Sequence, residues 1–586
     1  MLPEHAPFSP EQRSAAASLL QGLTPGQRLW LAGYLSAESG SETAAATPSA
    51  SPLLVLYGTE SGNAEALADL TAKQAKKRGF KPSVKNMADL SPADLAKAGK
   101  LLVIVSTWGD GDPPESATGF YNGLMQEKVD LSGVSFSVCA LGDTSYEQFC
   151  KTGKDIDARL EALGAKRTTP RKDCDVDYDE DHAAWLDEAL SSFGPAVAAP
   201  AAPAVAIPVA GEAFGKKNPF PSEMLEKVLL NGEGSQKETW HYELSLEGSG
   251  MSYLPGDALA VVPLNAPDMV EGVLKAAKLK GTEKVSLKGG DEKVLADALR
   301  EDFEITVLSK AVLKKLQAVA KSERLEGLLA DDAKDQLKDY LWGRWVADAL
   351  AEFAPKGVSA DELVGILRKL PPRLYSIASS PLAHPDEVHL TVASVRYEAH
   401  GLQRKGVAST FLADLVETGQ QVRVYTHVNK NFRLPDSDDT PIIMVGPGTG
   451  IAPFRAFVEH RAETGAKGDS WLIFGDQRYT YDFLYQLEWQ DHLSNGALNR
   501  LDVAFSRDQP EKVYVQDKMR ENAAELFAWL EKGAHFYVCG DASRMAHDVN
   551  EALIGIIEAE GKRSREEAEA YVEGLRKSKR YQRDVY

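Results

Sequence analysis

The stretch Leu53-Leu54-Val55-Leu56-Tyr57-Gly58-Thr59-Glu60-Ser61-Gly62-Asn63-Ala64 decides how the first part of the chain folds. Its apolar run, 53–57, is short and continuous, which predicts a strand buried on both faces. A helix is expected after it, through Lys77. The loop between them is rich in small and hydroxyl residues, whose backbone N–H groups can wrap a phosphate at the helix N-terminus. A single turn of this kind is usually only a turn, so the prediction depends on its neighbours.

Two more apolar strands are expected, at Leu101 to Ser106 and Ser135 to Leu141, with a helix from about Gly153. Strands that alternate with helices predict a doubly wound parallel sheet, which binds ligands at the carboxyl ends of its strands. The loops after these two strands place Trp108 and Tyr146 at that edge. Both rings could be partly buried structural residues. Three loops in register favour FMN, a flat ring system with a phosphate.

A second motif, Arg373-Leu374-Tyr375-Ser376-Ile377-Ala378-Ser379-Ser380, follows two prolines and is expected to precede a strand. The planar arginine fork suits a pyrophosphate, the tyrosine can stack on an isoalloxazine ring, and the serine can reach a ring nitrogen. Alone, the motif would more often be an ordinary strand end. A second phosphate loop, Gly406 to Thr410, opens a helix in the same β-rich region and makes FAD the favoured ligand.

A third motif, Gly446-Pro447-Gly448-Thr449-Gly450, lies between a strand and a helix but lacks the Gly-Lys-Ser/Thr ending of a nucleoside-triphosphate loop. A turn over a dinucleotide pyrophosphate fits better. Further along the chain, Ser506-Arg507 and Lys512 to Gln516 follow a later predicted strand. They could be a solvated basic spot, yet beside a dinucleotide fold they favour an extra phosphate, hence NADPH over NADH. Cys539 at a strand end and the terminal Tyr586 carry no function alone.

Composition narrows the possible ligands. The 586 residues carry 66 Lys and Arg against 86 Asp and Glu, a net charge of −20 that repels nucleic acid. Four cysteines without metal-ligand spacing suggest reduced thiols in a cytosolic protein and no metal site. No targeting or membrane segment is expected. The acidic run Asp173 to Asp181 is interpreted as solvated surface, or alternatively as a docking patch for a basic partner.

Two linkers organise the chain, Glu42 to Ser51 and the Ala/Pro-rich stretch Phe193 to Gly211. The predicted domains are residues 1–51 (N-terminal segment and linker), 52–193 (α/β), 194–218 (linker), 219–437 (β-rich, with a mostly helical insertion at about 266–369) and 438–586 (α/β). The later strands are expected at Glu238 to Leu246, Val388 to Tyr397, Gln421 to His427, Ile442 to Val445, Ser470 to Phe474, Leu501 to Phe505 and His535 to Cys539.

Across nearly its whole length this set of motifs resembles the diflavin reductases, which include cytochrome P450 reductase. Within them the closest resemblance is to the flavoprotein subunits of bacterial assimilatory NADPH–sulfite reductases. The features that carry it are Leu23-Thr24-Pro25 with Trp30 and Gly33-Tyr34, then Arg455-Ala456-Phe457, Lys512 to Gln516 and the terminal Arg580 to Tyr586. The resemblance implies a flavodoxin-like domain, a ferredoxin-reductase-like FAD β-barrel with a helical insertion, and a Rossmann-like NADPH domain.

The resemblance also implies roles for matching positions. FMN would be held by Thr59, Glu60, Ser61, Gly62, Asn63, Ala64, Ser106, Thr107, Trp108, Gly109, Leu141, Gly142, Asp143, Tyr146, Phe149 and Cys150. FAD would be held by Arg373, Leu374, Tyr375, Ser376, Thr391, Val392, Ala393, Tyr397, Gly406, Val407, Ala408 and Ser409. NADPH would be held by Gly448, Thr449, Ser506, Arg507, Lys512, Tyr514, Gln516 and Asp548. Ser376, Cys539 and Asp584 would line the hydride-transfer site, and Tyr586 would cover the flavin ring. Trp108 and Val407 depart from the residues common at their positions.

The implied activity is electron transfer from NADPH to FAD, then to FMN, then to a separate haemoprotein subunit that reduces sulfite. A soluble P450-reductase-like donor to another acceptor is the alternative enzyme, and a flavin-binding interaction module without turnover is the alternative from another class. The segment Pro10 to Ala37 has too many apolar residues for a short tail. It is expected to assemble the chain into a homo-oligomer, with a helix folded onto the FMN domain as the alternative.

Overall fold

The computed structural model describes residues 15, 51–109, 111–194, 214–287, 290–330 and 332–586. The chain divides into two units, Met1–Ser51 and Pro52–Tyr586. The predicted oligomerisation segment, apart from Ala15, lies outside the described residues, and so does most of the second linker. Within the described residues, no helix is both long enough and apolar enough to cross a membrane.

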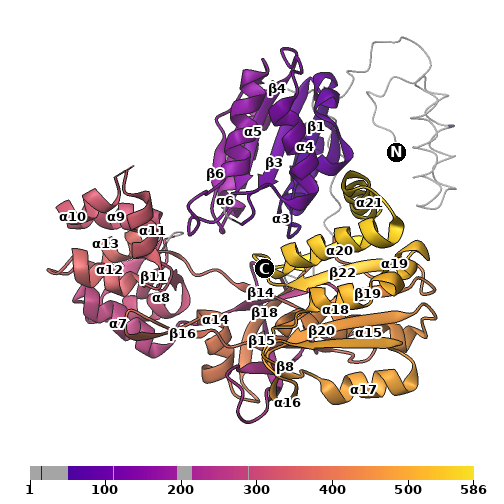
Figure 1. Ribbon diagram of the computed structural model, residues 1–586. Helices are drawn as coiled ribbons and strands as arrows, with labels where there is room; N and C mark the ends of the chain where they lie inside the picture. Colours follow the sequence, from indigo (N-terminus) through magenta and orange to yellow (C-terminus); the bar gives the residue numbers. More distant parts are fainter. Residues whose placement is uncertain (1–14, 16–50, 110, 195–213, 288–289, 331) are drawn as a thin grey trace. The chain divides into compact units, whose positions relative to one another are not determined.

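The first module is a parallel sheet with two helices on each face (Figure 1). Its strands run in the order β2 (Phe80–Asn86), β1 (Ser51–Gly58), β3 (Lys100–Ser106), β4 (Ser135–Leu141) and β5 (Lys166–Arg167), and β6 (Lys172–Cys174) also pairs with β4. Leu102 and Ile104 face the core under α3 (Asn63–Lys77) and α6 (Asp179–Ser192). Leu101 and Val103 face the core under α4 (Glu115–Gln126) and α5 (Lys151–Ala162). This alternation explains why the strands read as continuous apolar runs.

The second module is built on a six-stranded antiparallel sheet. The order is β14 (Arg373–Ser376), β9 (Ala258–Val262), β18 (Gln421–His427), β7 (Phe220–Leu229), β8 (Thr239–Ser245) and β15 (Glu387–Ala393). The motif Arg373 to Ser380 precedes β15 as predicted, and its first four residues, Arg373 to Ser376, themselves form a strand that pairs with β9. The stretch 388–397 is β-rich as predicted and contains parts of two strands: β15 ends at Ala393, and Tyr397 belongs to a hairpin of β16 (Arg396–Ala399) and β17 (Leu402–Lys405).

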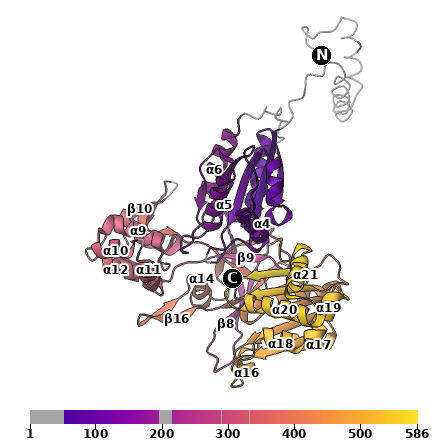
Figure 2. The ribbon, with the colours of Figure 1, turned by 45° about the horizontal axis from the view of Figure 1, so that its top comes forward.

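The predicted helical insertion is confirmed. Seven helices lie in it: α7 (Pro267–Ala277), α8 (Leu295–Glu301), α9 (Lys310–Ala320), α10 (Glu323–Leu328), α11 (Lys334–Leu341), α12 (Val346–Phe353) and α13 (Ala360–Ile366). They share one apolar core that includes Leu299, Leu313 and Leu350. Figures 1 and 2 both show α9 to α12 gathered together, apart from the sheet of the second module.

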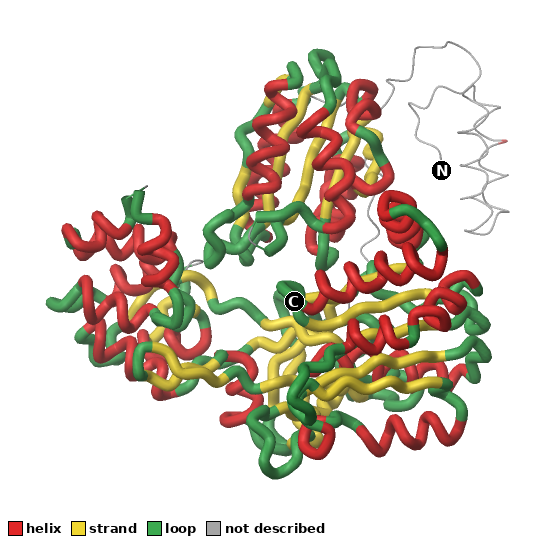
Figure 3. Tube along the Cα trace, in the orientation of Figure 1, coloured by secondary structure: helices red, strands yellow, loops and turns green. Residues whose placement is uncertain are grey.

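The third module is a five-stranded parallel sheet between two helical layers (Figure 3). Its order is β21 (Arg500–Phe505), β20 (Ser470–Asp476), β19 (Ile442–Val445), β22 (His535–Gly540) and β23 (Tyr581–Val585). One apolar core is shared with α18 (Val515–Glu521), α19 (Ala523–Glu531), α20 (Met545–Gly561) and α21 (Arg565–Lys577), and the other with α15 (Ala452–Thr464) and α17 (Gln486–Asn495). The sequence did not predict β23, which joins the chain terminus to the sheet beside β22.

Candidate active site

The predicted FMN loops meet at one sheet edge. The Gly62 N–H donates to Thr59 Oγ1 (3.0 Å), and Gly62 has a φ of 85°, a left-handed conformation that suits glycine. The loop after β3 is tied to β4 because the Thr107 N–H donates to the Leu141 carbonyl (2.9 Å). The Gly142 N–H donates in turn to the Cys174 carbonyl of β6 (3.0 Å). The loop after β3 is therefore tied to the end of β4 and the loop after β4 to β6, while the first loop is closed by its own hydrogen bond. All three present polar backbone at an edge where an anion can bind.

The two aromatic residues of these loops have different surroundings. Tyr146 is 53% exposed. Trp108 is half-buried and packs against the apolar cluster of the third module that includes Val538 and Val585. Trp108 therefore adjoins two modules, which the sequence did not predict.

The motif Arg373 to Ser376 places its charged and aromatic groups along β14. Arg373 and Leu374 are exposed, whereas Tyr375 is half-buried, and burial raises the pKa of the Tyr375 phenol. The second phosphate loop is held close to it. Gly406 precedes α14 (Val407–Thr410), and the Gly406 N–H donates to the Val395 carbonyl (2.9 Å). The Val395 N–H donates to Ser409 Oγ (3.1 Å), which fixes this loop beside the hairpin that carries Tyr397.

The glycine-rich loop of the third module lies directly on β22. A Cβ at Gly450 would be 2.1 Å from the Cys539 carbonyl oxygen, and a Cβ at Gly446 would be 2.4 Å from the Gly450 carbonyl oxygen. No side chain fits at either position, so glycine is required for the loop to approach the strand. Gly448 has a φ of 57°. The loop thereby exposes backbone at the carboxyl ends of β19 and β22, as a pyrophosphate site requires.

Three predicted catalytic residues meet although they come from three strands. Ser376 Oγ of β14 donates a 2.6 Å hydrogen bond to Asp584 Oδ2 of β23. The Cys539 thiol of β22 lies 3.9 Å from the same oxygen. Burial, chiefly, raises the pKa of Asp584, and burial followed by the nearby Asp584 charge raises the pKa of Cys539. At neutral pH the thiol is therefore a proton-bearing donor rather than a thiolate.

Tyr586 lies beside this cluster. Its backbone N–H donates to the Gly540 carbonyl (3.0 Å), and its carbonyl accepts from the Ala542 N–H (3.1 Å). Its phenol oxygen is 2.7 Å from Thr449 Oγ1 of the glycine-rich loop, while the side chain is 60% exposed. The terminal residue is thus anchored by its backbone and presents its ring.

Among the residues predicted to read the extra phosphate, which lie after β21, Ser506 is half-buried and Gln516 is buried. The Ser506 N–H donates to the Asp476 carbonyl (2.9 Å), and Arg507 and Lys512 are both exposed. Gln516 Nε2 donates to Asp548 Oδ2 (3.3 Å), which links α18 to α20. The predicted set is therefore gathered at one end of the sheet.

Sequence reasoning missed a contribution from the second module to this region. Gln236 Oε1 accepts a hydrogen bond from Arg507 Nη1 (2.8 Å). Lys237 Nζ donates to the buried Asp476 carboxylate (2.6 and 2.8 Å) and lies within 3.5 Å of a Cβ built on Gly448. The only available signal was a lysine in a Gly/Ser-rich turn, which carries no information about a loop more than 200 residues away.

A carboxylate of the first module holds the terminal strand. Glu115 Oε2 accepts a hydrogen bond from Arg583 Nε (2.5 Å), and Glu115 Oε1 forms an ion pair with Arg576 Nε (2.5 Å). The Glu115 N–H donates to Glu60 Oε2 (2.8 Å). Burial, followed by the Glu115 charge, raises the pKa of Glu60 to about 7. The phosphate loop of the first module is therefore connected through Glu115 to the residue next to Asp584.

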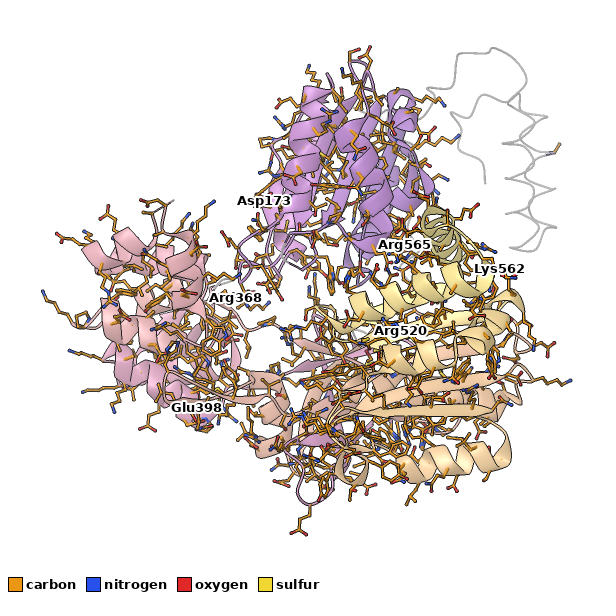
Figure 4. All side chains as sticks on the ribbon, in the orientation of Figure 1. Asp173, Arg368, Glu398, Arg520, Lys562 and Arg565 are labelled. Carbon is orange, nitrogen blue, oxygen red and sulfur yellow. The ribbon has the colours of Figure 1, made fainter. Side chains whose placement is uncertain are left out.

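The acidic run of the first module is paired within the chain. Asp173 binds Arg171, Asp175 lies near Arg368, Asp177 near Lys369, Asp179 near Lys216 and Asp181 near Lys172. Figure 4 labels Asp173 and Arg368, the latter at the end of the insertion. Arg368 also binds Asp143, a predicted FMN-loop residue, at 2.6 Å. These aspartates therefore already have basic partners within the same chain.

Comparisons with known proteins identify all three modules. The flavodoxin family matches residues 55–186, the FAD-binding domain family 212–411 and the oxidoreductase NAD-binding domain family 444–551. The sulfite reductase (NADPH) flavoprotein alpha-component of Bacillus subtilis is 50% identical, over 99% of each chain. The proteins with the same name from Aliivibrio fischeri and Vibrio parahaemolyticus are 43% and 42% identical, over 99% and 100% of this chain and 98% and 96% of theirs.

Proposed function

The chain belongs to the family of the sulfite reductase (NADPH) flavoprotein alpha-components, and we propose that it draws electrons from NADPH and delivers them to a separate haemoprotein that reduces sulfite. The chain is an oxidoreductase with FMN-, FAD- and NADPH-binding domains. When bound, NADPH supplies a hydride, FAD accepts it as two electrons, and FMN passes electrons singly. What remains to be assigned is what the chain's own residues do.

The first module holds FMN by its three loops. Backbone N–H groups after Thr59 and the start of α3 suit the phosphate, which is supported by the left-handed Gly62 and by the hydrogen bonds that fix the loops. Trp108 and Tyr146 provide the aromatic faces for the ring.

The second module holds FAD between β14 and the Gly406 loop. Arg373 is exposed and always charged, so it suits the pyrophosphate, and Tyr375 and Tyr397 supply aromatic surface. The hydroxyl of Ser409 keeps the phosphate loop beside the hairpin through the Val395 N–H.

The third module orients NADPH so that its nicotinamide reaches Ser376, Cys539 and Asp584. The Gly450 approach to Cys539 places the glycine-rich loop directly over this cluster. Arg507 and Lys512 bind the extra phosphate, and Lys237 holds the Asp476 carboxylate at the glycine-rich loop. Tyr586 must leave the flavin ring before nicotinamide can stack there.

The observation that carries the proposal is the junction of Ser376, Asp584 and Cys539, because it unites strands of two modules beside the dinucleotide loop. The direct test is the flavin content and activity of the purified chain. We expect one FMN and one FAD per chain and NADPH-dependent reduction of a dye such as cytochrome c. A chain that binds both flavins but does not oxidise NADPH would support a binding module instead.

Residues 1–51 supply the proposed self-association, and the haemoprotein binds elsewhere. The chain is also proposed to act in the cytoplasm, which is supported by its four cysteines, all described and all thiols. Deleting residues 1–51 should give a smaller species in solution that keeps both flavins and its dye reductase activity. An unchanged size, or loss of FMN, would show that this segment belongs to the first module's core.

A further inference from the structure

Three histidines and two glutamates converge on one face of the second module's sheet, and none of them is a predicted cofactor ligand. His241 and Glu243 lie on β8, and Glu387 and His389 on β15. The strands are antiparallel, with His389 opposite Glu243. Because side chains alternate along a strand, these four share one face. His384, in the turn before β15, adds a third imidazole.

The distances between these groups match those between ligands of one ion. His241 Nε2 is 3.2 Å from Glu243 Oε1, and His389 Nε2 is 3.9 Å from the same oxygen. His389 Nε2 is also 3.2 Å from Glu387 Oε2, and His384 Nδ1 lies 3.9 Å from that oxygen. Zinc–ligand bonds of about 2.0–2.2 Å in a tetrahedron separate the ligand atoms by roughly 3.3 Å.

The second ring nitrogen of His241, Nδ1, already has a hydrogen-bond partner. His241 Nδ1 is 2.9 Å from the Tyr485 hydroxyl, which is 2.6 Å from Thr391 Oγ1. If Nδ1 donates to Tyr485, and Tyr485 to Thr391, the Nε2 lone pair faces Glu243. Metal-binding histidines commonly have their second nitrogen engaged in this way.

The second ring nitrogen of His389, Nδ1, lies 3.3 Å from Arg455 Nη1. An arginine only donates, so in the metal-free protein the His389 proton is on Nε2. Metal binding at Nε2 moves that proton to Nδ1, where it replaces this long contact with two donors that face each other. Arg455 keeps shorter bonds to the Ala378 carbonyl (2.8 Å), Glu459 (2.9 Å) and Glu488 (2.6 Å).

The cluster has a surplus of carboxylates. Glu243 and Glu387 face the same imidazoles, and Glu459 lies 3.4 Å from His384. A divalent cation would relieve the repulsion between the carboxylates.

We propose that His241, Glu243 and His389 form a site for a divalent transition ion such as Zn²⁺, with Glu387 and His384 at its edge. The donor set, two imidazoles and a carboxylate, is one that zinc accepts. The ion would join β8 to β15. Through the contact of His384 with Glu459 of α15, it would also brace the second module against the third.

The test is calorimetric titration of the flavin-replete, EDTA-treated chain with Zn²⁺, and with Mg²⁺ to measure binding to carboxylates in general. Glu243→Gln keeps the shape and a hydrogen-bond acceptor for His241 but removes the charged ligand. His400→Gln is the matched control, because His400 contacts only a backbone carbonyl, that of Trp342, among the described hydrogen bonds. We expect the wild type and His400→Gln to bind one Zn²⁺ that Glu243→Gln binds at least about tenfold more weakly.

Equal zinc binding by all three proteins, or a wild type that binds Zn²⁺ no better than Mg²⁺, would overturn the proposal. Unchanged FAD content shows that Glu243→Gln is folded. His241→Gln carries the same expectation from the imidazole side. Co²⁺ gives a second readout, since a tetrahedral site should absorb at wavelengths beyond those of the oxidised flavins, and that absorption should be absent from both variants.

Discussion

Ser376 Oγ and Asp584 Oδ2 lie 2.6 Å apart, although 208 positions separate the two residues in sequence. The bond joins the edge strand β14 of the second module to the terminal strand β23 of the third. The Cys539 thiol also lies 3.9 Å from Asp584 Oδ2. The position of this carboxylate is therefore set by both modules, and the proposed hydride-transfer site exists only where they meet.

Asp584→Asn should slow flavin reduction by NADPH by roughly 10- to 100-fold, the scale of losing a charged hydrogen bond of about 1.5–3 kcal/mol. Stopped-flow absorbance of the flavin measures this rate. Flavin content and the affinity for NADP⁺ should be unchanged, because Asp584 is not among the phosphate-binding residues. A rate equal to wild type would remove the cluster from the mechanism.

Coenzyme choice should depend on Arg507 and Lys512. Changing both to glutamine should raise the KM for NADPH by at least about tenfold, from the loss of charged contacts to the extra phosphate. The KM for NADH should change little. Equal losses with both coenzymes would mean that these residues position the dinucleotide in general.

Tyr586 should discriminate between coenzymes in a different way. Its ring must move before nicotinamide stacks, which penalises the more weakly held coenzyme most. Tyr586→Ala should therefore raise activity with NADH relative to NADPH and change the flavin absorption spectrum. Tyr586→Phe, which loses only the 2.7 Å contact with Thr449, is the control and should resemble wild type. No change in the alanine variant would contradict ring stacking.

Glu115 should matter for electron transfer between the modules rather than for the hydride step. Glu115→Gln weakens the ion pairs with Arg576 and Arg583 that tie the first module to β23. We expect FAD reduction at the wild-type rate, followed by FMN reduction that is slower than in the wild type at the same salt concentration. The FMN reduction rate of the variant should resemble that of the wild type at high salt, because salt screens the ion pairs there. Stopped-flow spectra resolve the two phases. Slowing of the first phase alone would contradict this assignment.

The stability of the first module should fall in mild acid because of His182. Burial lowers the pKa of this imidazole to about 4 from its ordinary 6.5, and its Nε2 lies 3.0 Å from Thr71 Oγ1. Above pH 6.5 the residue is neutral in both states. As pH falls toward 4, only the unfolded chain gains the proton, which costs about 2 kcal/mol of stability by pH 5. His182→Gln should reduce this pH dependence of unfolding. Unfolding is monitored by the fluorescence of the FMN that is released. An identical pH dependence in the variant would assign it to other groups.

The sequence located the elements whose signals are local. Ser135–Leu141, Gln421–His427 and Ile442–Val445 are strands with the predicted bounds, because each is a continuous or alternating apolar run. The sequence did not show that Arg373 to Ser376 is itself a strand, since its pairing with β9 depends on residues more than 100 positions away. The same limit explains why β23 was missed: its polar residues Gln582, Arg583 and Asp584 become strand only by adding to the edge of β22.

Whether a site residue could be predicted likewise depends on whether its signal is local in the sequence. The proposed phosphate-binding loops could be predicted because glycine and hydroxyl residues stand between a strand and a helix. Glu115 and Lys237 gave no such signal, since their roles come from contacts with other modules. Trp108 was predicted as a flavin-stacking ring, but its packing against the third module is a tertiary property.

The central claim is delivery of electrons to a sulfite-reducing haemoprotein. The most direct measurement mixes the flavin-replete chain, NADPH and a purified sulfite reductase haemoprotein, and quantifies sulfide against NADPH oxidised. Reduction of sulfite to sulfide takes six electrons, so the account predicts three NADPH per sulfide and no sulfide when either protein is omitted. NADPH oxidation without sulfide, together with active reduction of another haemoprotein, would contradict it.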